Sequence, residues 1–590
     1  MYLGVDFGTS YCQVAYRHNG VVRVLDKPGQ YGVDSVFYYD KESAEEKKSE
    51  YIKRLKKEIS ENARKNNVDK TEEEIEKEVN DIVDKLEKWC FGIVGKTAYS
   101  KVGFDNEFHN LVREVKLLVK DNASFELDGK TFTAEEIIKA IYREVIFVYA
   151  KERGENEIPD FTIDGIVLTH PAGFEMPEVN TLCSAAKQCG CAEGKKLNVI
   201  GTIKEPVAAA LSYYDANKNL PDGTGILVYD LGGGTCDIAL VRKKKEEIQE
   251  YEVVDSDMIR VGGKDWDDII YDYISNVVKN QSKNSDYMLN ENASNMFVLV
   301  NASKNIKERL TESSTVKEII DLFPSDDLST KESFKIEITR TDFDDLSQTL
   351  RNQTINKLET MYQKHCKDVD ISEVILVGGA SVMPQIKEGI EERLIEVLNA
   401  DIVVRSHEEA YAISRGAAIY ADKVMERLKE KYSEDEIKSL LEQKNGDEVF
   451  SKGSLANLLI SDEEGKGVIT DILPYSYGVR FVYQGKSYIK NLVKQGDTLP
   501  ATGIYNGFNP NIDANTVIVE VYESERCDDC YILSDERLVG RVELHVPGGI
   551  KKSDKVGCEI KIFSLDEVVA NATGNNQKAT AEFKLNITNN

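Results

Sequence analysis

Residues 228–240 read VYDLGGGTCDIAL, an apolar strand that runs into three glycines, a threonine and an aspartate before a second strand begins. Glycines, which lack a Cβ, let backbone N–H groups approach anionic oxygens closely. Thr235 adds a hydroxyl donor, and Asp230 and Asp237 have the side chains that hold a hydrated cation or orient water. The stretch predicts a phosphate-binding turn between two strands, although taken alone it is equally typical of an ordinary hairpin.

Two other stretches have a related pattern. Residues 2–16, YLGVDFGTSYCQVAY, again place an aspartate, a glycine and two hydroxyls between apolar strands. Residues 374–384, VILVGGASVMP, indicate a buried parallel strand and a tight turn that opens a helix, where open α/β sheets bind ligands. Since neither GxxxxGK[ST] nor GxGxxG accompanies these loops, a P-loop or Rossmann fold is disfavoured.

The three loops together resemble those of the actin-like ATPases, in which two lobes clamp ATP between two phosphate hairpins and an adenosine loop. Residues 201–214, GTIKEPVAAALSYY, are similar to the segment that heat-shock protein 70 (DnaK-type) chaperones place between their lobes. Other similar segments follow in the family's order and extend the resemblance over nearly the whole chain: IVLTHPAGF from Ile166, VGGKDWD from Val261, ITRTDFDDL from Ile338 and EEAYAISRGAA from Glu408.

The resemblance implies an α/β fold, with a two-lobed actin-like (ribonuclease H-like) ATPase followed by an all-β sandwich that binds substrate. A chain of 590 residues is also longer than one hydrophobic core usually serves. The expected divisions are a nucleotide-binding domain at 1–422 with lobes at about 1–197 and 198–422, a helical insertion at about 41–90, a charged linker at 423–469 and a sandwich at 470–590.

The resemblance also implies the site residues. Mg²⁺ would be held largely through water by Asp6, Glu205 and Asp230. Lys116, Glu205, Thr235 and Asp237 would be catalytic, because a lysine stabilises charge on a transferring phosphoryl group. An exposed helical lysine is the alternative for Lys116. ATP or ADP would contact Gly8, Thr9, Ser10, Tyr11, Gly232, Gly233, Gly234, Thr235, Lys307, Gly378 and Gly379.

The adenosine side departs from the family pattern. Glu308 stands where the family usually has an arginine. Ala380 and Val382 replace the usual serine and the arginine that covers the adenine. Weaker nucleotide binding and relaxed adenine selectivity are therefore expected.

Two charged segments interrupt the family pattern. Apolar residues at helical spacing between 41 and 88 predict a helical hairpin, interpreted as a solvated decoration with a docking surface as the alternative. Between the lobes and the sandwich, 455–460 supply an apolar stretch that would serve as the interdomain linker, displaced by extra residues.

The C-terminal part is similar to the substrate-binding β-domain of the family, beginning with TDILPYSYGV at 470–479. Runs of β-branched residues broken by Gly, Pro, Asn and Asp independently predict a β-sandwich. By the resemblance, Ile489 and Val517 line the peptide groove, while Val519 and Val521 build the core. The given sequence stops after EFKLNITNN without the family's helical lid, so an open groove with fast peptide release is expected.

Charge and hydropathy limit the compartment and the partners. Lys+Arg 75 against Asp+Glu 103 gives 75 − 103 = −28, which disfavours bulk attraction to nucleic acid or an anionic membrane. No apolar run reaches membrane-spanning length, and the N-terminus enters a strand without a leader. A cytoplasmic protein is expected.

The ten cysteines give no clear metal site. The pairs Cys189/Cys191 and Cys527/Cys530 each lack a second spaced pair, which a zinc site would need. Metal or disulfide chemistry stays open for the second pair. Reduced packing residues are expected at Cys12, Cys183 and Cys236.

Two functions from different classes remain. The first is an ATP-dependent chaperone that binds extended apolar peptides, for which the resemblance implies a J-domain co-chaperone and a nucleotide exchange factor as partners. The second is a nucleotide-sensing interaction protein with one dedicated partner and negligible turnover. A sugar kinase on the same actin-like fold is disfavoured by the β-sandwich.

Overall fold

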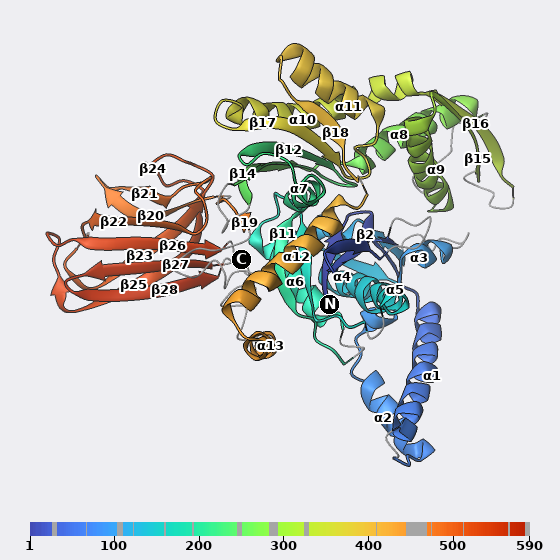
Figure 1. The fold of residues 1–590 in the computed structure, drawn as a ribbon, viewed down its shortest axis with the longest axis horizontal. Coiled ribbons are helices and arrows are strands. Elements are labelled where there is room, and N and C mark those ends of the chain that lie inside the picture. The colour runs from blue at the N-terminus through green and yellow to red at the C-terminus, as the bar shows by residue number, and fades with distance from the viewer. Residues whose placement is uncertain are drawn as a thin grey trace.

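The computed structural model places a two-lobed α/β region beside a separate β-sandwich, which confirms the predicted fold class (Figure 1). Within the described residues, no helix is long and apolar enough to cross a membrane. The described residues are 1–25, 32–65, 68–102, 110–121, 123–158, 161–190, 194–244, 251–282, 293–323, 330–408, 410–443, 469–473, 475–510, 512–564 and 567–584.

Lobe I (residues 1–204) is built on a mixed sheet. Its strands are β1 (Tyr2–Phe7), β2 (Tyr11–His18), β3 (Val21–Val24), β4 (Val33–Asp34), β10 (Gly165–His170) and β11 (Val199–Lys204). The order is β11-β10-β1-β2-β3, with β4 paired to β2, and β10 runs parallel to both neighbours. The sequence alone assigned 198–204 to the second lobe, but the pairing of β11 with β10 puts them in lobe I.

Short strands and helices complete lobe I. A capping box fixes the start of α4, where Thr133 and Glu136 exchange side-chain to backbone hydrogen bonds. The elements are β5 (Val36–Tyr38), β6 (Ile93–Val94), β7 (Leu111–Arg113), β8 (Ser124–Leu127), β9 (Lys130–Thr133), η1 (Lys88–Phe91), α3 (Lys96–Ser100), η3 (Val115–Leu118), α4 (Ala134–Tyr142), η4 (Arg143–Ala150), α5 (Lys151–Glu157) and α6 (Met176–Gln188).

Two helices project from lobe I, at the lower right of Figure 1: α1 (Lys41–Lys65) and α2 (Glu72–Val83). They are the helical hairpin that the apolar spacing predicts. Tyr51, Ile59 and Val79 are buried in a small core of the hairpin's own, so its other faces are left to charged side chains.

Lobe II (residues 224–406) has a second sheet of order β18-β17-β12-β13-β14-β19. Strand β12 of this sheet is buried on both faces: Leu227 and Tyr229 belong to one core, and Ile226 and Val228 to another. The elements are β12 (Thr224–Leu231), β13 (Cys236–Lys243), β14 (Tyr251–Ile259), β15 (Thr315–Leu322), β16 (Glu332–Thr339), β17 (Asp370–Val377), β18 (Val403–Ser406), β19 (Ile469–Thr470), α8 (Gly263–Gln281), α9 (Ala293–Glu312), α10 (Arg340–His365), α11 (Pro384–Glu391) and η6 (Glu392–Val397).

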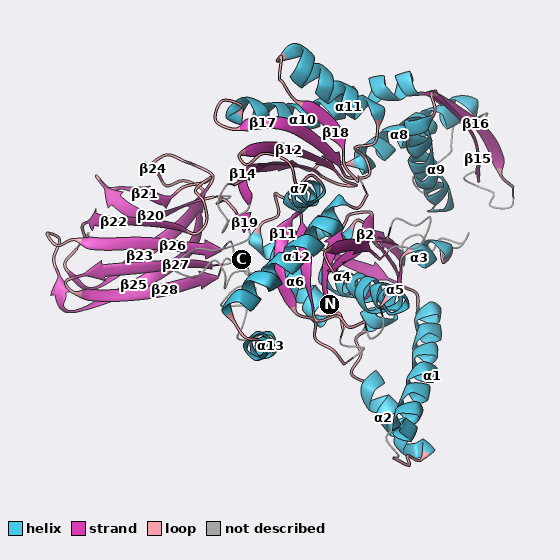
Figure 2. Cartoon of the chain, in the orientation of Figure 1, coloured by secondary structure: helices cyan, strands magenta, loops and turns pink. Residues whose placement is uncertain are grey.

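The helices α7 (Glu205–Ala216) and α12 (Ala412–Lys431) pack together between the lobes, as the centre of Figure 2 shows. Their backbones touch at Gly416, where an added Cβ would lie 1.7 Å from the Ala208 carbonyl oxygen. α12 ends nine residues beyond the boundary expected at 422, and α13 (Glu434–Gln443) adds Ile437 to the same core.

The β-sandwich packs sheet β24-β21-β20-β23-β25 against sheet β22-β26-β27-β28. Val479, Val519 and Val521 lie in its core, as the sequence predicts for Val519 and Val521. The strands are β20 (Ser476–Tyr483), β21 (Lys486–Val493), β22 (Ala501–Phe508), β23 (Ala514–Ser524), β24 (Cys530–Ile532), β25 (Arg537–Ile550), β26 (Val556–Ser564), β27 (Glu567–Gly574) and β28 (Gln577–Lys584).

Candidate active site

The two glycine turns have the same construction and face each other. In the β1–β2 turn the Gly8 N–H donates to the Tyr11 carbonyl at 3.0 Å, and in the β12–β13 turn the Gly232 N–H donates to the Thr235 carbonyl at 3.0 Å. A Cβ added to Gly233 would lie 2.4 Å from the Ser10 hydroxyl. The lobes therefore bring together backbone N–H groups and hydroxyls, the donors that cradle phosphate.

Four acidic side chains and one lysine are buried beside these turns. Asp6 is the penultimate residue of β1, Asp230 and Asp237 pair directly across β12 and β13, and Glu205 opens α7. The Lys116 ammonium, 2% exposed, donates to the Glu205 carboxylate at 2.5 Å. Lys116 is therefore a buried lysine paired with an acid, and the alternative of an exposed helical lysine is excluded.

Thr169 and the Ala172 backbone, which the sequence did not single out, hold two of the acids. The Thr169 hydroxyl donates to Asp6 at 3.0 Å, and the Ala172 N–H donates to Asp237 at 2.5 Å. Both donors lie in IVLTHPAGF, one of the segments that resemble the family and occur in the family's order along the chain. Their position at the carboxyl end of β10 was the signal that would have identified them.

The four buried acids outnumber the one lysine, and the pKa values of the three aspartates are raised. Burial and the neighbouring Glu205 raise the pKa of both Asp6 and Asp237 to about 7. Burial and the same carboxylate raise the pKa of Asp230 well above its usual range. Burial lowers the pKa of Lys116, but Glu205 and Asp6 raise it by more, so the ammonium stays charged.

Two carboxylate oxygens point to a cation. Asp230 Oδ1 and Asp237 Oδ2 are buried and have no hydrogen-bond partner in the structure. An excess of buried negative charge with free lone pairs is the chemistry that hydrated Mg²⁺ satisfies. No group of three or more His, Cys, Asp or Glu in the described part of the chain is arranged to hold a metal ion directly. The residues fit an ion that keeps most of its water.

We expect the stabilisation by Mg²⁺ and ADP to depend on pH. The raised pKa values mean that Asp6 and Asp237 bind protons more tightly in the folded chain than in the unfolded chain, so their contribution to stability is present below about pH 4 and is lost as pH rises through about 7. Burying the ionised carboxylates costs free energy of folding. A bound cation offsets that cost only at a pH at which the carboxyls are ionised. Thermal unfolding should show a larger rise in Tm on adding Mg²⁺ and ADP at about pH 8 than at about pH 6. An equal rise at both would contradict the proposed cation site.

The third loop lies against the second turn. Gly378 has a φ of +82°, and an added Cβ would lie 2.4 Å from the Leu231 carbonyl oxygen, so glycine is required there. The Lys307 ammonium contacts Asp267 at 2.8 Å and the Gly263 carbonyl at 2.8 Å. Gly379 faces open space. The loop and α9 thus meet beside the phosphate turns.

A second lysine of α9, which the sequence analysis did not identify as a site residue, reaches across to lobe I. Lys304 lies one helical turn before Lys307. Its ammonium donates to the Tyr11 hydroxyl at 2.7 Å and lies 4.8 Å from the centre of that ring. The spacing of three residues was the available signal. Lys304 therefore joins lobe II to the first phosphate turn.

Restoring an arginine over the base should tighten nucleotide binding. Val382 is 43% exposed, so a longer side chain has room. A guanidinium on an aromatic face contributes roughly 0.5–2 kcal/mol, so Val382→Arg should bind ATP about threefold to thirtyfold more tightly, as measured by calorimetry. Val403→Arg, at a similarly exposed valine of β18, is the matched control. Neutral or weaker binding by Val382→Arg would mean that the pocket is closed differently.

The expected peptide groove needs a correction. Ile489 pairs with Arg480, whereas Val479 pairs with Val521 and shares its face with Val517, so Ile489 and Val517 lie on opposite faces of the sheet. The cause is a register shift that skips Leu492 in β21. Without this bulge, Ile489 would pair with Phe481 and face the same side as Val517.

An aromatic group lies on the face that holds Val517. Phe481 and Tyr488 stack with ring centres 5.6 Å apart, and Phe481 reaches Phe508 of the other sheet at 5.8 Å. Tyr505 packs on Phe508 at 4.8 Å and is 37% exposed. We call Phe481, Tyr488, Tyr505 and Phe508 the aromatic group; it gathers large apolar surface at one end of the sandwich.

The sandwich is connected to lobe II by a docked strand. β19 runs parallel to β14, with Ile469 opposite Tyr251. Residues 455–460, which the sequence offered as the linker, lie outside the described residues. The stretch that docks is 469–472, directly before the sandwich.

One ion pair joins the same stretch to the end of β11 in lobe I. The Asp471 carboxylate accepts from the Lys204 ammonium at 2.8 Å, and Lys204 is only 6% exposed. Ile472 packs in the core with α7 and α12, while Leu473 packs in the core of the sandwich. Lys204 directly precedes Glu205, the partner of the Lys116 ammonium. The interdomain contact is therefore one residue from the buried acids.

The cysteines follow their environment. Cys12, Cys183 and Cys236 are buried and form no disulfide, while Cys527 and Cys530 are exposed and form none. Cys191 lies outside the described residues.

Comparison with known proteins agrees with the fold. A sequence model described as "Hsp70 protein" matches residues 2–431. The chain is 27% identical over 471 residues to "Heat shock cognate 70 kDa protein 3" of Dictyostelium discoideum, covering 79% of this chain and 64% of that protein. It is 28% identical over 424 residues to "Heat shock 70 kDa protein" of Neurospora crassa, covering 71% and 55%. The alignments thus span 55–64% of the length of these relatives, less than two thirds. The chain belongs to the Hsp70 family, as a divergent member.

Proposed function

We propose that this chain is an ATP-dependent molecular chaperone of the Hsp70 type, in which ATP hydrolysis controls peptide binding by the β-sandwich. The observation that carries the proposal is the ion pair of Asp471 with Lys204. Because Lys204 precedes Glu205, and Glu205 holds Lys116, a change at the nucleotide and a change in the docking of the sandwich act on adjoining residues.

The buried residues are suited to phosphoryl transfer to water. Asp6, Glu205 and Asp230 would hold Mg²⁺ through its water ligands, and the ion would neutralise charge on the phosphates. Lys116 supplies a fixed positive charge, and Thr235 and Asp237 orient the attacking water. No covalent intermediate is needed, because preorganised charges and donors lower the barrier by themselves.

The peptide is proposed to lie on the aromatic group. Its rings, together with Val517, offer a partly exposed apolar surface at one end of the sandwich. Extended segments with a central Leu or Ile would bury that side chain there, which contributes about 1.5–3 kcal/mol. A J-domain co-chaperone and a nucleotide exchange factor are proposed as further partners on the strength of family membership.

The alternative is a nucleotide-sensing protein with a dedicated partner and negligible turnover. Glu308 and Val382 support it, since both replace residues that grip adenosine in the family. Steady-state ATP turnover with and without an apolar peptide separates the two. The chaperone requires measurable turnover that the peptide accelerates. Nucleotide binding without turnover would replace it by the alternative.

A further inference from the structure

Lys116 stands on a short and unusual piece of backbone. Its segment, 114–117, begins with Glu114 in the left-handed region at a φ of 59° and continues into the single 3-10 turn of η3. A non-glycine residue at this φ costs free energy, so neighbouring contacts must hold it. Those contacts come largely from lobe II.

The first contact is an ion pair across the lobes. The Lys264 ammonium lies 2.9 Å from the Glu114 carboxylate. Lys264 stands in the first turn of α8, and its backbone N–H donates to the Gly233 carbonyl at 2.8 Å. The second phosphate turn is thereby connected through one residue to the segment that carries Lys116.

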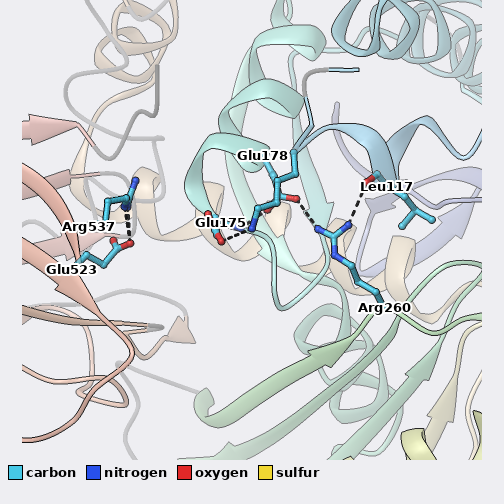
Figure 3. Close-up of polar contacts among 7 residues, drawn as sticks. Leu117, Glu175, Glu178, Arg260, Glu523 and Arg537 are labelled. Atoms are coloured by element: carbon cyan, nitrogen blue, oxygen red, sulfur yellow. Dashed lines mark hydrogen bonds and ion pairs between the residues drawn. The ribbon is translucent and has the colours of Figure 1, made fainter. Parts of the chain in front are cut away.

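The second contact holds the other end of the segment (Figure 3). The Arg260 guanidinium donates to the Leu117 carbonyl at 3.3 Å and to the Glu178 carboxylate at 3.4 Å. Glu178 is 3% exposed and also accepts from the Glu175 N–H at the start of α6. Arg260, directly after β14, thus contacts two separate parts of lobe I.

The third contact is steric. A Cβ added to Gly234 would lie 2.6 Å from a methyl of Leu117, so the second phosphate turn packs directly on this side chain. Glu114 and Leu117 flank Lys116, and both are held by residues of lobe II. A shift of lobe II relative to lobe I would therefore displace the backbone on both sides of the lysine.

We propose that Arg260 and Lys264 are positioning residues, which set the Lys116 ammonium when the lobes close on nucleotide. The inference rests on the proposed ATP hydrolysis by this site. The proposal does not require either side chain to contact the nucleotide. Their effect is exerted through the backbone at Glu114 and Leu117, and a small misplacement of a catalytic group is enough to slow a reaction considerably.

A charge swap tests the Lys264–Glu114 pair. Lys264→Glu and Glu114→Lys should each lower the single-turnover rate of ATP hydrolysis about tenfold, with the Kd for ATP within about threefold of the parent. The double variant Lys264→Glu/Glu114→Lys should recover most of the rate, because the pair is restored with its signs exchanged. Arg260→Ala should give a similar loss at unchanged Kd.

The matched control is Lys120→Glu. Lys120 makes a 2.7 Å ion pair with Glu175 inside lobe I, at an exposure close to that of Lys264. It should leave the rate unchanged. Thermal unfolding of each variant separates positioning from misfolding, since a positioning loss appears at an unchanged Tm.

These experiments distinguish failure of the positioning role from failure of the proposed ATP hydrolysis. Single variants at the parental rate, or a double variant slower than both singles, would overturn the positioning role while leaving ATP hydrolysis intact. A parent that binds ATP and does not hydrolyse it would overturn the proposed function, and the positioning role with it.

Discussion

Lys116→Ala should lower the single-turnover rate of ATP hydrolysis by about 10²- to 10³-fold, or about 3 kcal/mol in the barrier. The lysine is buried, charged and fixed by Glu205, so the positive charge costs little to orient when the phosphoryl group transfers. Water that enters the vacated space would supply a weaker and mobile dipole. Rapid mixing of the protein with stoichiometric ATP measures this step without product release.

The control for this variant is Lys120→Ala, four residues further along the chain and half exposed. Because Lys116→Ala leaves Glu205 without its cation, a lower Tm is also expected. ATP binding by the variant must therefore be verified under the assay conditions. Hydrolysis by Lys116→Ala at the parental rate would remove this lysine from the chemistry.

Val517→Phe should abolish detectable binding of an extended apolar peptide. Val517 shares its face with Phe481 and packs at the edge of the sandwich core, so a benzyl group there would occupy the space proposed for the peptide side chain. Loss of an anchor worth about 1.5–3 kcal/mol weakens binding roughly tenfold or more, and the added bulk also excludes the peptide backbone. Fluorescence anisotropy of a labelled peptide measures the affinity.

Ile518→Phe is the matched control. Ile518 is the next residue of β23, is 55% exposed and points to the opposite face. The same substitution there should leave peptide binding unchanged. Equal loss in both variants would indicate a general effect on the sandwich, and no loss in Val517→Phe would place the peptide elsewhere.

The phosphate turns could be predicted from the sequence because each is a continuous stretch. A glycine turn between two apolar strands fixes its own backbone, so the Gly8 and Gly232 turns need little information from the rest of the chain. The acids Asp6 and Asp230 lie at the ends of those same strands. Their arrangement follows from local geometry.

The peptide surface could not be predicted in the same way. A single skipped residue, Leu492, reverses the side of the sheet to which Ile489 points. Such a bulge leaves no reliable mark in an alternating pattern, since it is decided by pairing with another strand. The aromatic group likewise joins β20, β21 and β22, which only the packed sheets bring together.

The contacts between the lobes, and between lobe I and the segment before the sandwich, could not be predicted from the sequence either. Lys204 and Asp471 are 267 residues apart in sequence, and Arg260 reaches Leu117 across 143 residues. Charged residues are common in this chain, so no spacing distinguishes these from solvated ones. Pairing of β19 with β14 selects the first contact, and closure of the lobes selects the second.

Stopped flow that follows the release of a fluorescent apolar peptide from the ADP-bound protein after mixing with ATP tests whether nucleotide controls peptide binding. A coupling free energy of 1–3 kcal/mol between the nucleotide and peptide sites predicts release about 5- to 150-fold faster with ATP than with ADP. Asp471→Ala, which removes the ion pair to Lys204, should reduce that difference. The same release rate with ATP and with ADP in the parent protein would contradict an ATP-controlled chaperone.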